Sequence, residues 1–160
     1  MMYILITTNK GQIIRLSPDD IDLSEVTWCL DNSRGKYPIG RYNGPIVKLH
    51  RIVAERMIGK PIPKDMVVDH IDGDPLNCHR DNLRIATPRQ NMQNRKHHQN
   101  SKHAYKGIMV NGSGHHWFAR IMHHGKYQLF GPYDTPLEAA KMYDIKAKEY
   151  FGEYARINGV

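Results

Sequence analysis

The sequence predicts an α+β protein built from three successive parts. Turn signals divide the first 50 residues into short alternating stretches, which favours a small N-terminal antiparallel platform. The middle of the chain, Val68–Asn91, places many polar residues between two short apolar segments. The last third reads as three strands followed by one helix, typical of a three-stranded antiparallel sheet packed on that helix.

The N-terminal platform is predicted from its turns. Asn9-Lys10-Gly11 divides the first alternating stretch and indicates a hairpin. A second turn, Asn43-Gly44, precedes another apolar segment, and Trp28 and Tyr37 are expected in the core or in cross-strand pairs. The strands expected here are Tyr3–Thr8, Gln12–Leu16, Val26–Leu30, Lys36–Arg41 and Ile46–Leu49.

A helix, two strands and a second helix are predicted in the middle of the chain. His50–Ile58 has apolar residues at mixed helical spacing, and Gly59 and two prolines then stop the helix. Met66–Ile71 and Asn82–Ala86 read as strands that flank a loop rich in Asp, Gly and Pro. Thr87, Pro88 and Gln90 form a capping-box pattern that starts the second helix. Helical spacing would then align four polar side chains on one stripe: Asn91, Asn94, Arg95 and His98.

The C-terminal part is predicted to fold as a unit of its own. Gln99–His103 is polar and is interpreted as a linker. Thr135-Pro136 with Glu138 repeats the capping pattern and starts a helix to about Phe151, which Gly152 ends. We therefore divide the chain into residues 1–98, a linker at 99–104 and residues 105–160. The three expected strands are Tyr105–Val110, His115–His123 and Lys126–Tyr133.

The charge distribution favours a nucleic-acid partner. The 160 residues carry a formal charge of +7, with a pI near 9.4. No acidic residue lies between Asp81 and Asp134, an interval that holds eight Lys or Arg residues and seven of the ten histidines. A solvated surface normally mixes both signs, so this long single-sign stretch indicates an anionic partner.

Cysteine usage and hydropathy limit the remaining classes. The two cysteines, Cys29 and Cys78, form no Cys-x-x-Cys pair, which argues against a disulfide framework and against a four-cysteine zinc site. No apolar run is long enough to span a membrane, and no signal peptide is recognised. We expect an intracellular protein without a membrane partner.

Four polar residues of the central segment have the chemistry of a one-metal phosphodiester-cleaving site. His70 is a credible general base, since imidazole is largely neutral near pH 7. Asp69 and Asn91 offer hard oxygen ligands, which suit Mg²⁺ or Mn²⁺. Adjacent strand residues point to opposite faces, so Asp69 and His70 can share a site only where the strand ends or is distorted. Asn82, at the start of the partner strand, is placed to orient His70.

The residues alone leave other interpretations open. The same segment could be a turn-rich loop in which the polar residues are incidental. Asp72-Gly73-Asp74 also hints at a calcium loop, although the spaced acids and closing Glu of an EF-hand are not completed.

The segment resembles the ββα-metal signature of H-N-H endonucleases. The resemblance covers roughly residues 25–98 and is carried by Val68 to Gly73, Asn82-Leu83-Arg84, Thr87 and Asn91, with Leu49 to Ala54 upstream resembling phage and intron-encoded homing endonucleases. It implies His70 as general base, Asn82 as the residue that positions it, and Asp69 and Asn91 as ligands of one Mg²⁺ or Mn²⁺ per site. The final signature residue is often His and is Asn91 here. No zinc is expected, and Cys78-His79 is interpreted as loop surface.

The C-terminal part resembles the APETALA2-type DNA-binding domain over about residues 104–158. The motifs are Tyr105 to Ile108, Trp117-x-Ala119-x-Ile121, Gly131-x-Tyr133, Glu138 to Asp144 and Ala155-x-Ile157-Asn158. Alternation places Trp117, Ala119 and Ile121 against the helix and leaves the opposite face for the major groove. Only Arg120 keeps the arginine-rich character of the plant domains. The DNA-contacting residues expected along the chain are Arg84, Arg95, Lys96, Lys106, Asn111, Arg120, Lys126 and Tyr127.

These features predict a homing-type endonuclease that hydrolyses one phosphodiester bond of double-stranded DNA at a recognised site. One active site per chain predicts nicking by a monomer or weak dimer, in the cytoplasm of a bacterial host. The alternatives are a DNA-binding regulator with an inactive nuclease core and a non-specific nicking nuclease. RNA is a weaker candidate substrate, since a sheet suited to the major groove does not suit A-form RNA.

Overall fold

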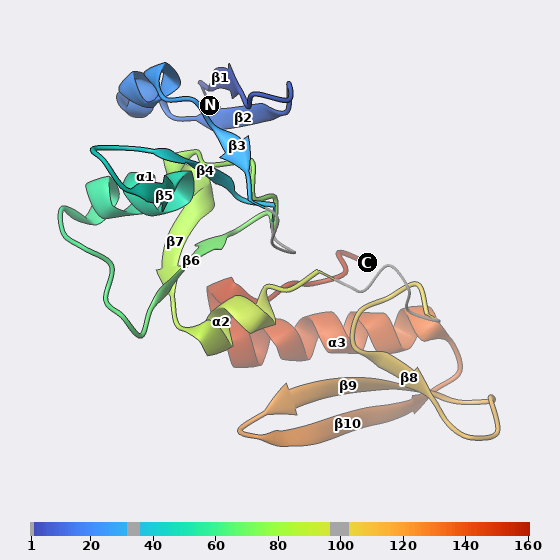
Figure 1. Ribbon diagram of the computed structural model, residues 1–160. Helices are drawn as coiled ribbons and strands as arrows, with labels where there is room; N and C mark the ends of the chain where they lie inside the picture. The colour runs from blue at the N-terminus through green and yellow to red at the C-terminus, as the bar shows by residue number, and fades with distance from the viewer. Residues whose placement is uncertain (1, 32–35, 97–102) are drawn as a thin grey trace. The chain divides into compact units, whose positions relative to one another are not determined.

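The computed structural model of the protein describes residues 2–31, 36–96 and 103–160 (Figure 1). The chain divides into two compact units, Met1–Asn91 and Met92–Val160. The expected linker at 99–104 lies mostly outside the described residues. No helix in the described ranges has the length and apolar character needed to cross a membrane.

The first unit begins with the predicted hairpin. Strands β1 (Ile4–Thr7) and β2 (Ile13–Leu16) pair antiparallel, and a 3-10 segment, η1 (Pro18–Glu25), follows. A second antiparallel sheet has the order β3-β4-β5. Its strands are shorter than predicted: β3 (Cys29–Leu30), β4 (Pro38–Arg41) and β5 (Ile46–Lys48).

Trp28 fills the centre of this unit, as expected, and is 1% exposed. A Cβ atom built on Gly40 would lie 2.9 Å from Trp28 Cε3, so only glycine lets β4 approach the indole this closely. Helix α1 (Leu49–Ile58) adds Leu49 and Val53 to the same core and ends at Gly59 in the left-handed conformation. This core therefore supports the polar segment Val68–Asn91.

Strands β6 (Val67–His70) and β7 (Leu83–Ala86) form a two-stranded antiparallel sheet with Asp69 opposite Arg84. Helix α2 (Pro88–Gln93) follows directly. The prediction that Asn94 and Arg95 continue a polar stripe on α2 was wrong, because the helix ends at Gln93. Asn94 is 5% exposed and therefore buried, and His98 lies outside the described residues.

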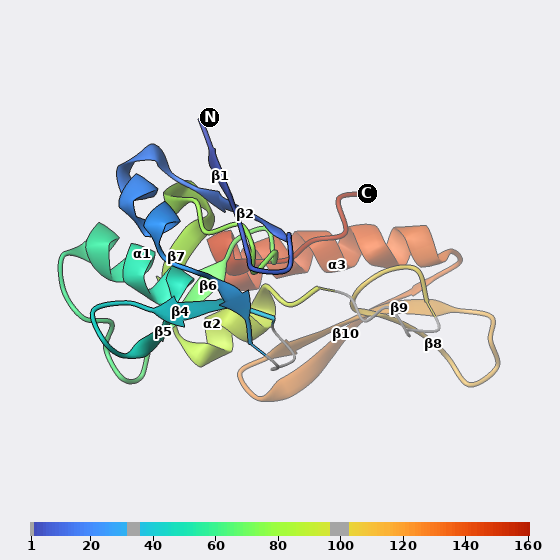
Figure 2. The same ribbon diagram turned by 45° about the horizontal axis from the view of Figure 1, so that its top comes forward.

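The second unit is a three-stranded antiparallel sheet with one long helix. Strands β8 (Ile108–Val110), β9 (Trp117–His123) and β10 (Lys126–Tyr133) are ordered β10-β9-β8. Helix α3 (Pro136–Phe151) runs along one face of this sheet in both views (Figures 1 and 2), and a 3-10 turn, η3 (Gly152–Tyr154), follows it.

Small residues let α3 lie close to the sheet. Ala119 and Ile121 of β9 pack with Tyr143 and Ala147 of α3, which confirms the predicted inner face of β9 at these two residues. Trp117, predicted on the same face, is only half-buried. Leu137, in the first turn of the helix, is 40% exposed and lies outside this core.

Candidate active site

Asp69 and His70 lie at the end of β6 and are both buried, with 3% and 6% of their surfaces exposed. The strand stops at His70, and the backbone turns at once, since Gly73 N donates a hydrogen bond to His70 O at 2.8 Å. The strand was predicted to run to Ile71 and ends one residue earlier, so Asp69 and His70 are its last two residues.

Asp69 is held by its cross-strand neighbour Arg84. The Arg84 Nε and Nη2 atoms donate to Asp69 Oδ2 at 2.9 Å and 2.7 Å. The side chain of Arg84 is only 12% exposed. Sequence reasoning expected Arg84 along the DNA backbone. In the structure it lies inside the polar segment, bound to the proposed metal ligand, and only the β6–β7 register reveals this pairing.

His70 is surrounded by two aromatic side chains that sequence reasoning did not select for the site. Its ring lies 5.1 Å from that of His50 and 5.9 Å from that of Tyr37, centroid to centroid. Burial lowers the pKa of His70 to about 4, against the raising influence of Asp72, Asp69 and Asp74. The imidazole is therefore neutral near pH 7 and able to accept a proton.

Asn82 makes several of the hydrogen bonds that hold the loop after β6. Its Oδ1 accepts a hydrogen bond from Asp72 N at 3.0 Å, and its Nδ2 donates to Asp72 Oδ1 and to Asn77 O. Its backbone carbonyl accepts from Ile71 N at 2.9 Å. Asn82 thus fixes the two residues immediately after His70, so it can position His70 through the backbone.

The N-terminal platform also contacts the loop that follows β6. Arg15 N donates to Leu76 O and Arg15 O accepts from Cys78 N, each at 2.9 Å. Arg80 donates through Nε to Asp20 Oδ2 at 2.8 Å, and Asp20 is fully buried. These contacts join the platform to the loop after β6. The interpretation of Cys78-His79 as loop surface was wrong, because both residues are buried against the platform side of the first unit.

Asn91 lies in the first turn of α2, and its side chain is exposed. The predicted capping box is confirmed: Gln90 N donates to Thr87 Oγ1 at 3.2 Å, and Thr87 N donates to Gln90 Oε1 at 2.8 Å. Asn91 N in turn donates to Thr87 O at 3.0 Å. The cap therefore fixes the backbone that carries Asn91.

The two donors predicted from the sequence, Asp69 and Asn91, have the chemistry that a hard divalent cation prefers, and Asp69 is bonded to Arg84 in the structure. Asp69 supplies a carboxylate and Asn91 an amide oxygen, the ligand types that Mg²⁺ and Mn²⁺ prefer. Within residues 2–31, 36–96 and 103–160, no cluster of three His, Cys, Asp or Glu side chains could hold a metal ion. A site made by Asp69 and Asn91 would thus need further oxygens from water or from the substrate.

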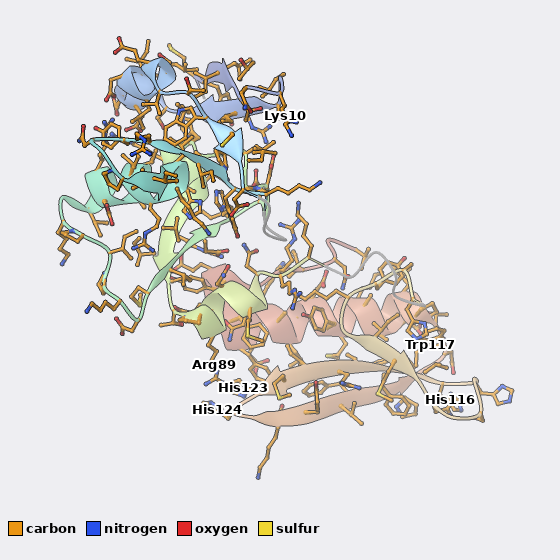
Figure 3. All side chains as sticks on the ribbon, viewed as in Figure 1. Lys10, Arg89, His116, Trp117, His123 and His124 are labelled. Carbon is orange, nitrogen blue, oxygen red and sulfur yellow. The ribbon has the colours of Figure 1, made fainter. Side chains whose placement is uncertain are left out.

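The predicted DNA-contacting residues of the second unit occupy different environments. Arg120 is exposed on β9 and lies over the Tyr127 ring of β10, 3.9 Å from the centroid, and Lys126 is exposed at the start of β10. Asn111 Oδ1 accepts from His115 N and His116 N, and so shapes the β8–β9 turn. The His116 side chain projects away from that turn, and His123 and His124 lie where β9 turns into β10 (Figure 3).

Lys106 and the residues after α2, which were also predicted to contact DNA, likewise occupy different environments. Lys106 Nζ donates to Gln93 O and Arg95 O, each at 2.8 Å, and burial lowers its pKa to about 8. Arg95 and Lys96 are exposed beyond the end of α2. Lys106 thus stabilises the chain after α2, whereas Arg95 and Lys96 are accessible to a phosphate backbone.

Comparison with known proteins assigns the family. Residues 47–93 match the model of an HNH endonuclease family, a segment that contains α1, the β6–β7 sheet and α2. Over 159 residues the chain is 33% identical to an uncharacterised HNH endonuclease of Acanthamoeba polyphaga mimivirus, covering 99% of this chain and 81% of that protein. The chain belongs to the HNH endonuclease family. HNH nucleases act on DNA and generally depend on a divalent metal ion.

Two further relatives share parts of the chain. Protein 3.8 of Escherichia phage T7 is 35% identical over 96 residues, which are 60% of this chain and 78% of that protein. A protein of the SPbeta prophage of Bacillus subtilis, named as a candidate HNH homing endonuclease, is 54% identical over 43 residues, or 27% of this chain and 24% of that protein. No solved structure matches the chain.

Proposed function

We propose that the protein is a homing-type DNA endonuclease that nicks double-stranded DNA at a recognised site, with His70 as its general base. The observation that carries this proposal is a buried imidazole next in sequence to a buried carboxylate, at the point where β6 ends. The family supports DNA cleavage, and the homing type agrees with the name of the prophage relative.

In the proposed reaction, His70 takes a proton from a water molecule whose oxygen attacks the phosphorus atom. The bond from phosphorus to the 3′ oxygen breaks, the leaving oxygen takes a proton from a second water molecule, and His70 returns its own proton to the hydroxide that this leaves. Asp69 and Asn91 would hold one Mg²⁺ or Mn²⁺, which when bound supplies positive charge to the developing phosphorane and to the leaving oxygen. Asn82 keeps the backbone after His70 in place while the imidazole acquires its proton.

The second unit is proposed to bind the duplex as an APETALA2-type module, through the face of its sheet that α3 does not cover. Arg120 with Tyr127 would contact base edges, and Lys126 the backbone. This assignment rests on the motifs of residues 104–158 and on the agreement of a three-stranded sheet and one helix with that architecture. With one site per chain, a monomer would leave a nick, and a dimer or two sequential cuts would break both strands.

The test is nicking of supercoiled plasmid by the full chain in Mg²⁺ and in EDTA, with His70→Ala beside the native protein. We expect a nicked product in Mg²⁺ only, and none with His70→Ala, while a gel-shift measurement shows DNA binding in both. Full activity of His70→Ala would overturn the proposed mechanism. A native protein that binds DNA but never nicks it would be a regulator with an inactive core. Mapping the cuts on a genomic library then separates a site-recognising enzyme from a non-specific one.

A further inference from the structure

Two aromatic side chains enclose His70, and the proposed reaction uses neither of them. His50, in the first turn of α1, meets His70 edge to face, with ring planes at 89°. Tyr37, just before β4, stacks on His70 with ring planes at 28°. Tyr37 and His50 also contact each other, with centroids 4.8 Å apart. All three side chains belong to the first unit.

Both enclosing residues make further contacts within the first unit. His50 is 6% exposed and is flanked on α1 by the fully buried Leu49. Tyr37 N donates to Asp31 Oδ1, and Asp31 N donates to Tyr37 O, each at 2.9 Å. Lys48 Nζ lies 4.6 Å from the Tyr37 ring centroid and 3.8 Å from Asp31 Oδ2. These contacts restrain the backbone and ring of Tyr37, and burial restrains the ring of His50.

Neither ring carries charge near neutral pH. Burial lowers the pKa of His50 to about 3, with further lowering by His70, Lys48 and Arg51. Burial raises the pKa of Tyr37, as do Asp31 and Asp69. A neutral imidazole and a neutral phenol are poor partners for a phosphate group compared with Lys or Arg. Direct binding of the DNA backbone is therefore not the role of these rings.

His50 is also a costly choice for a residue that only fills the core. Its Nδ1 atom is buried and makes no hydrogen bond to any part of the chain that the structure describes. A buried polar atom without a hydrogen bond destabilises the folded state, and an apolar side chain of similar size would avoid that cost. The edge-to-face contact with His70 accounts for a planar ring at this position, and the unpaired Nδ1 is not part of that contact.

We propose that His50 and Tyr37 are positioning residues that clamp the His70 imidazole in the orientation needed for proton transfer. This inference rests on the proposed role of His70 as general base. A stacked ring restricts tilting of the imidazole, and an edge-to-face ring restricts its rotation about the side-chain bonds. A general base acts only within hydrogen-bond reach of its proton, and a misplacement of ~1 Å can cost on the order of 100-fold in rate.

The experiment measures nicking of supercoiled plasmid by the full chain in Mg²⁺, with DNA concentration varied to separate kcat from KM. We expect His50→Ala and Tyr37→Ala each to lower kcat by about 10-fold to 100-fold, as for a misplaced catalytic group. KM should stay unchanged, because neither ring binds DNA. His50→Phe and Tyr37→Phe keep a ring in place and should recover most of the lost kcat.

Val53→Ala is the matched control, since Val53 lies on α1, is fully buried and belongs to the apolar core. It should lower the melting temperature as His50→Ala does, while kcat below the melting transition stays native. Should His50→Ala fail to fold, the comparison of Tyr37→Ala with Tyr37→Phe tests the proposal, because Tyr37 is only half-buried and its variants should fold.

The outcomes separate this inference from the proposed function. A native protein that does not nick in Mg²⁺ would overturn both. Native kcat in His50→Ala and Tyr37→Ala, with nicking still dependent on His70, would overturn the clamp alone. A change confined to KM would identify the rings as DNA-binding groups and overturn it too. Folded Phe variants that recover nothing would show that the polar atoms matter and the rings do not.

Discussion

Arg84 donates two hydrogen bonds to a single oxygen of Asp69, from Nε at 2.9 Å and from Nη2 at 2.7 Å. Both groups are largely buried, so the pair is screened only weakly by water. The same carboxylate is the proposed ligand of the divalent ion. Arg84 thus neutralises Asp69, and a divalent ion bound at the proposed site would compete with Arg84 for this carboxylate.

Arg84→Ala is expected to destabilise the protein and to strengthen metal binding. Removing one partner of a buried ion pair costs about 3–5 kcal/mol, because the remaining charge is left uncompensated. A bound cation can compensate Asp69, so Mg²⁺ or Mn²⁺ should raise the melting temperature of the variant more than that of the native protein. Differential scanning calorimetry with and without the ion measures this shift.

Arg51→Ala provides the control for the loss of an arginine, since the Arg51 side chain is 43% exposed and pairs only with Glu55, at 3.8 Å, among the ion pairs found in the described residues. Its metal-dependent shift should equal that of the native protein. If Arg84→Ala also shows the native shift, then Asp69 does not bind the ion in competition with Arg84.

Asn82→Ala should lower both stability and rate. Its amide makes three hydrogen bonds that hold the loop after His70, and their removal leaves buried polar groups without partners. We expect a loss of about 2–3 kcal/mol in the free energy of unfolding. The nicking rate should fall because the backbone next to His70 is no longer fixed. Urea unfolding and single-turnover nicking measure the two effects.

Asn77→Ala is the comparison for this loop, because Asn77 is equally buried and its Nδ2 donates to the same Asp72. The substitution keeps the backbone carbonyl that Asn82 binds, so its effect on the rate should be smaller. Equal rates for the native protein and Asn82→Ala would remove the proposed positioning role of Asn82.

Stability should depend on pH through His50. Its pKa is about 3 in the folded protein, mainly because of burial, and about 6.5 in an unfolded chain. Between these values the unfolded chain binds more protons, so the free energy of unfolding decreases as the pH falls. The slope contributed by one such histidine is at most about 1.4 kcal/mol per pH unit.

His50→Phe isolates this contribution, because the phenyl ring does not titrate. In EDTA, the native protein should lose stability relative to His50→Phe as the pH falls from about 6.5 to 4, whereas the difference should be constant above pH ~7. Parallel curves for the two proteins across the whole range would mean that His50 is not held neutral by burial.

The second unit should contribute affinity through its sheet. Lys126→Ala is expected to reduce the slope of log binding constant against log salt by about 0.9, the value for one lost phosphate contact. Arg120→Ala should instead weaken the preference among duplexes selected from a random library, because we assign it to base edges. Fluorescence anisotropy at several salt concentrations measures both.

Lys141 supplies the control, since it is an exposed basic residue on α3 rather than on the sheet. Lys141→Ala should bind DNA with the native salt slope. An equal slope change in Lys126→Ala and Lys141→Ala would indicate general attraction to the basic protein and not binding by the sheet.

The sequence predicted the order of elements well because local signals determine it. The β1–β2 hairpin, the Thr87 cap and β10 at Lys126–Tyr133 all follow from turn residues, capping residues or alternation. The end of α2 was missed because polar residues at helical spacing do not require a helix to continue. Asn94 is buried just beyond that end, which depends on packing that no local pattern specifies.

The partners of the site residues depend on contacts between segments far apart in the sequence. Asp69 and His70 were selected for their chemistry, and the structure buries both. The pairing of Arg84 with Asp69 requires the β6–β7 register, which the sequence does not fix. His50 and Tyr37 reach His70 only because α1 and β4 pack near β6, so neither could be chosen from its own neighbours in the sequence.

The cap of α2 gives the last prediction, because it fixes the backbone of the proposed ligand Asn91. Thr87→Ala removes the oxygen that accepts from Gln90 N and should cost about 1 kcal/mol of stability. It should also weaken metal binding, since Asn91 is then less firmly held, and Thr87→Ser should restore both. Isothermal titration with Mn²⁺ measures the affinity.

Thr135→Ala removes the equivalent cap of α3, where Glu138 N donates to Thr135 Oγ1, and should lower stability without changing metal affinity. If Thr87→Ala behaves like Thr135→Ala, the cap of α2 serves stability alone.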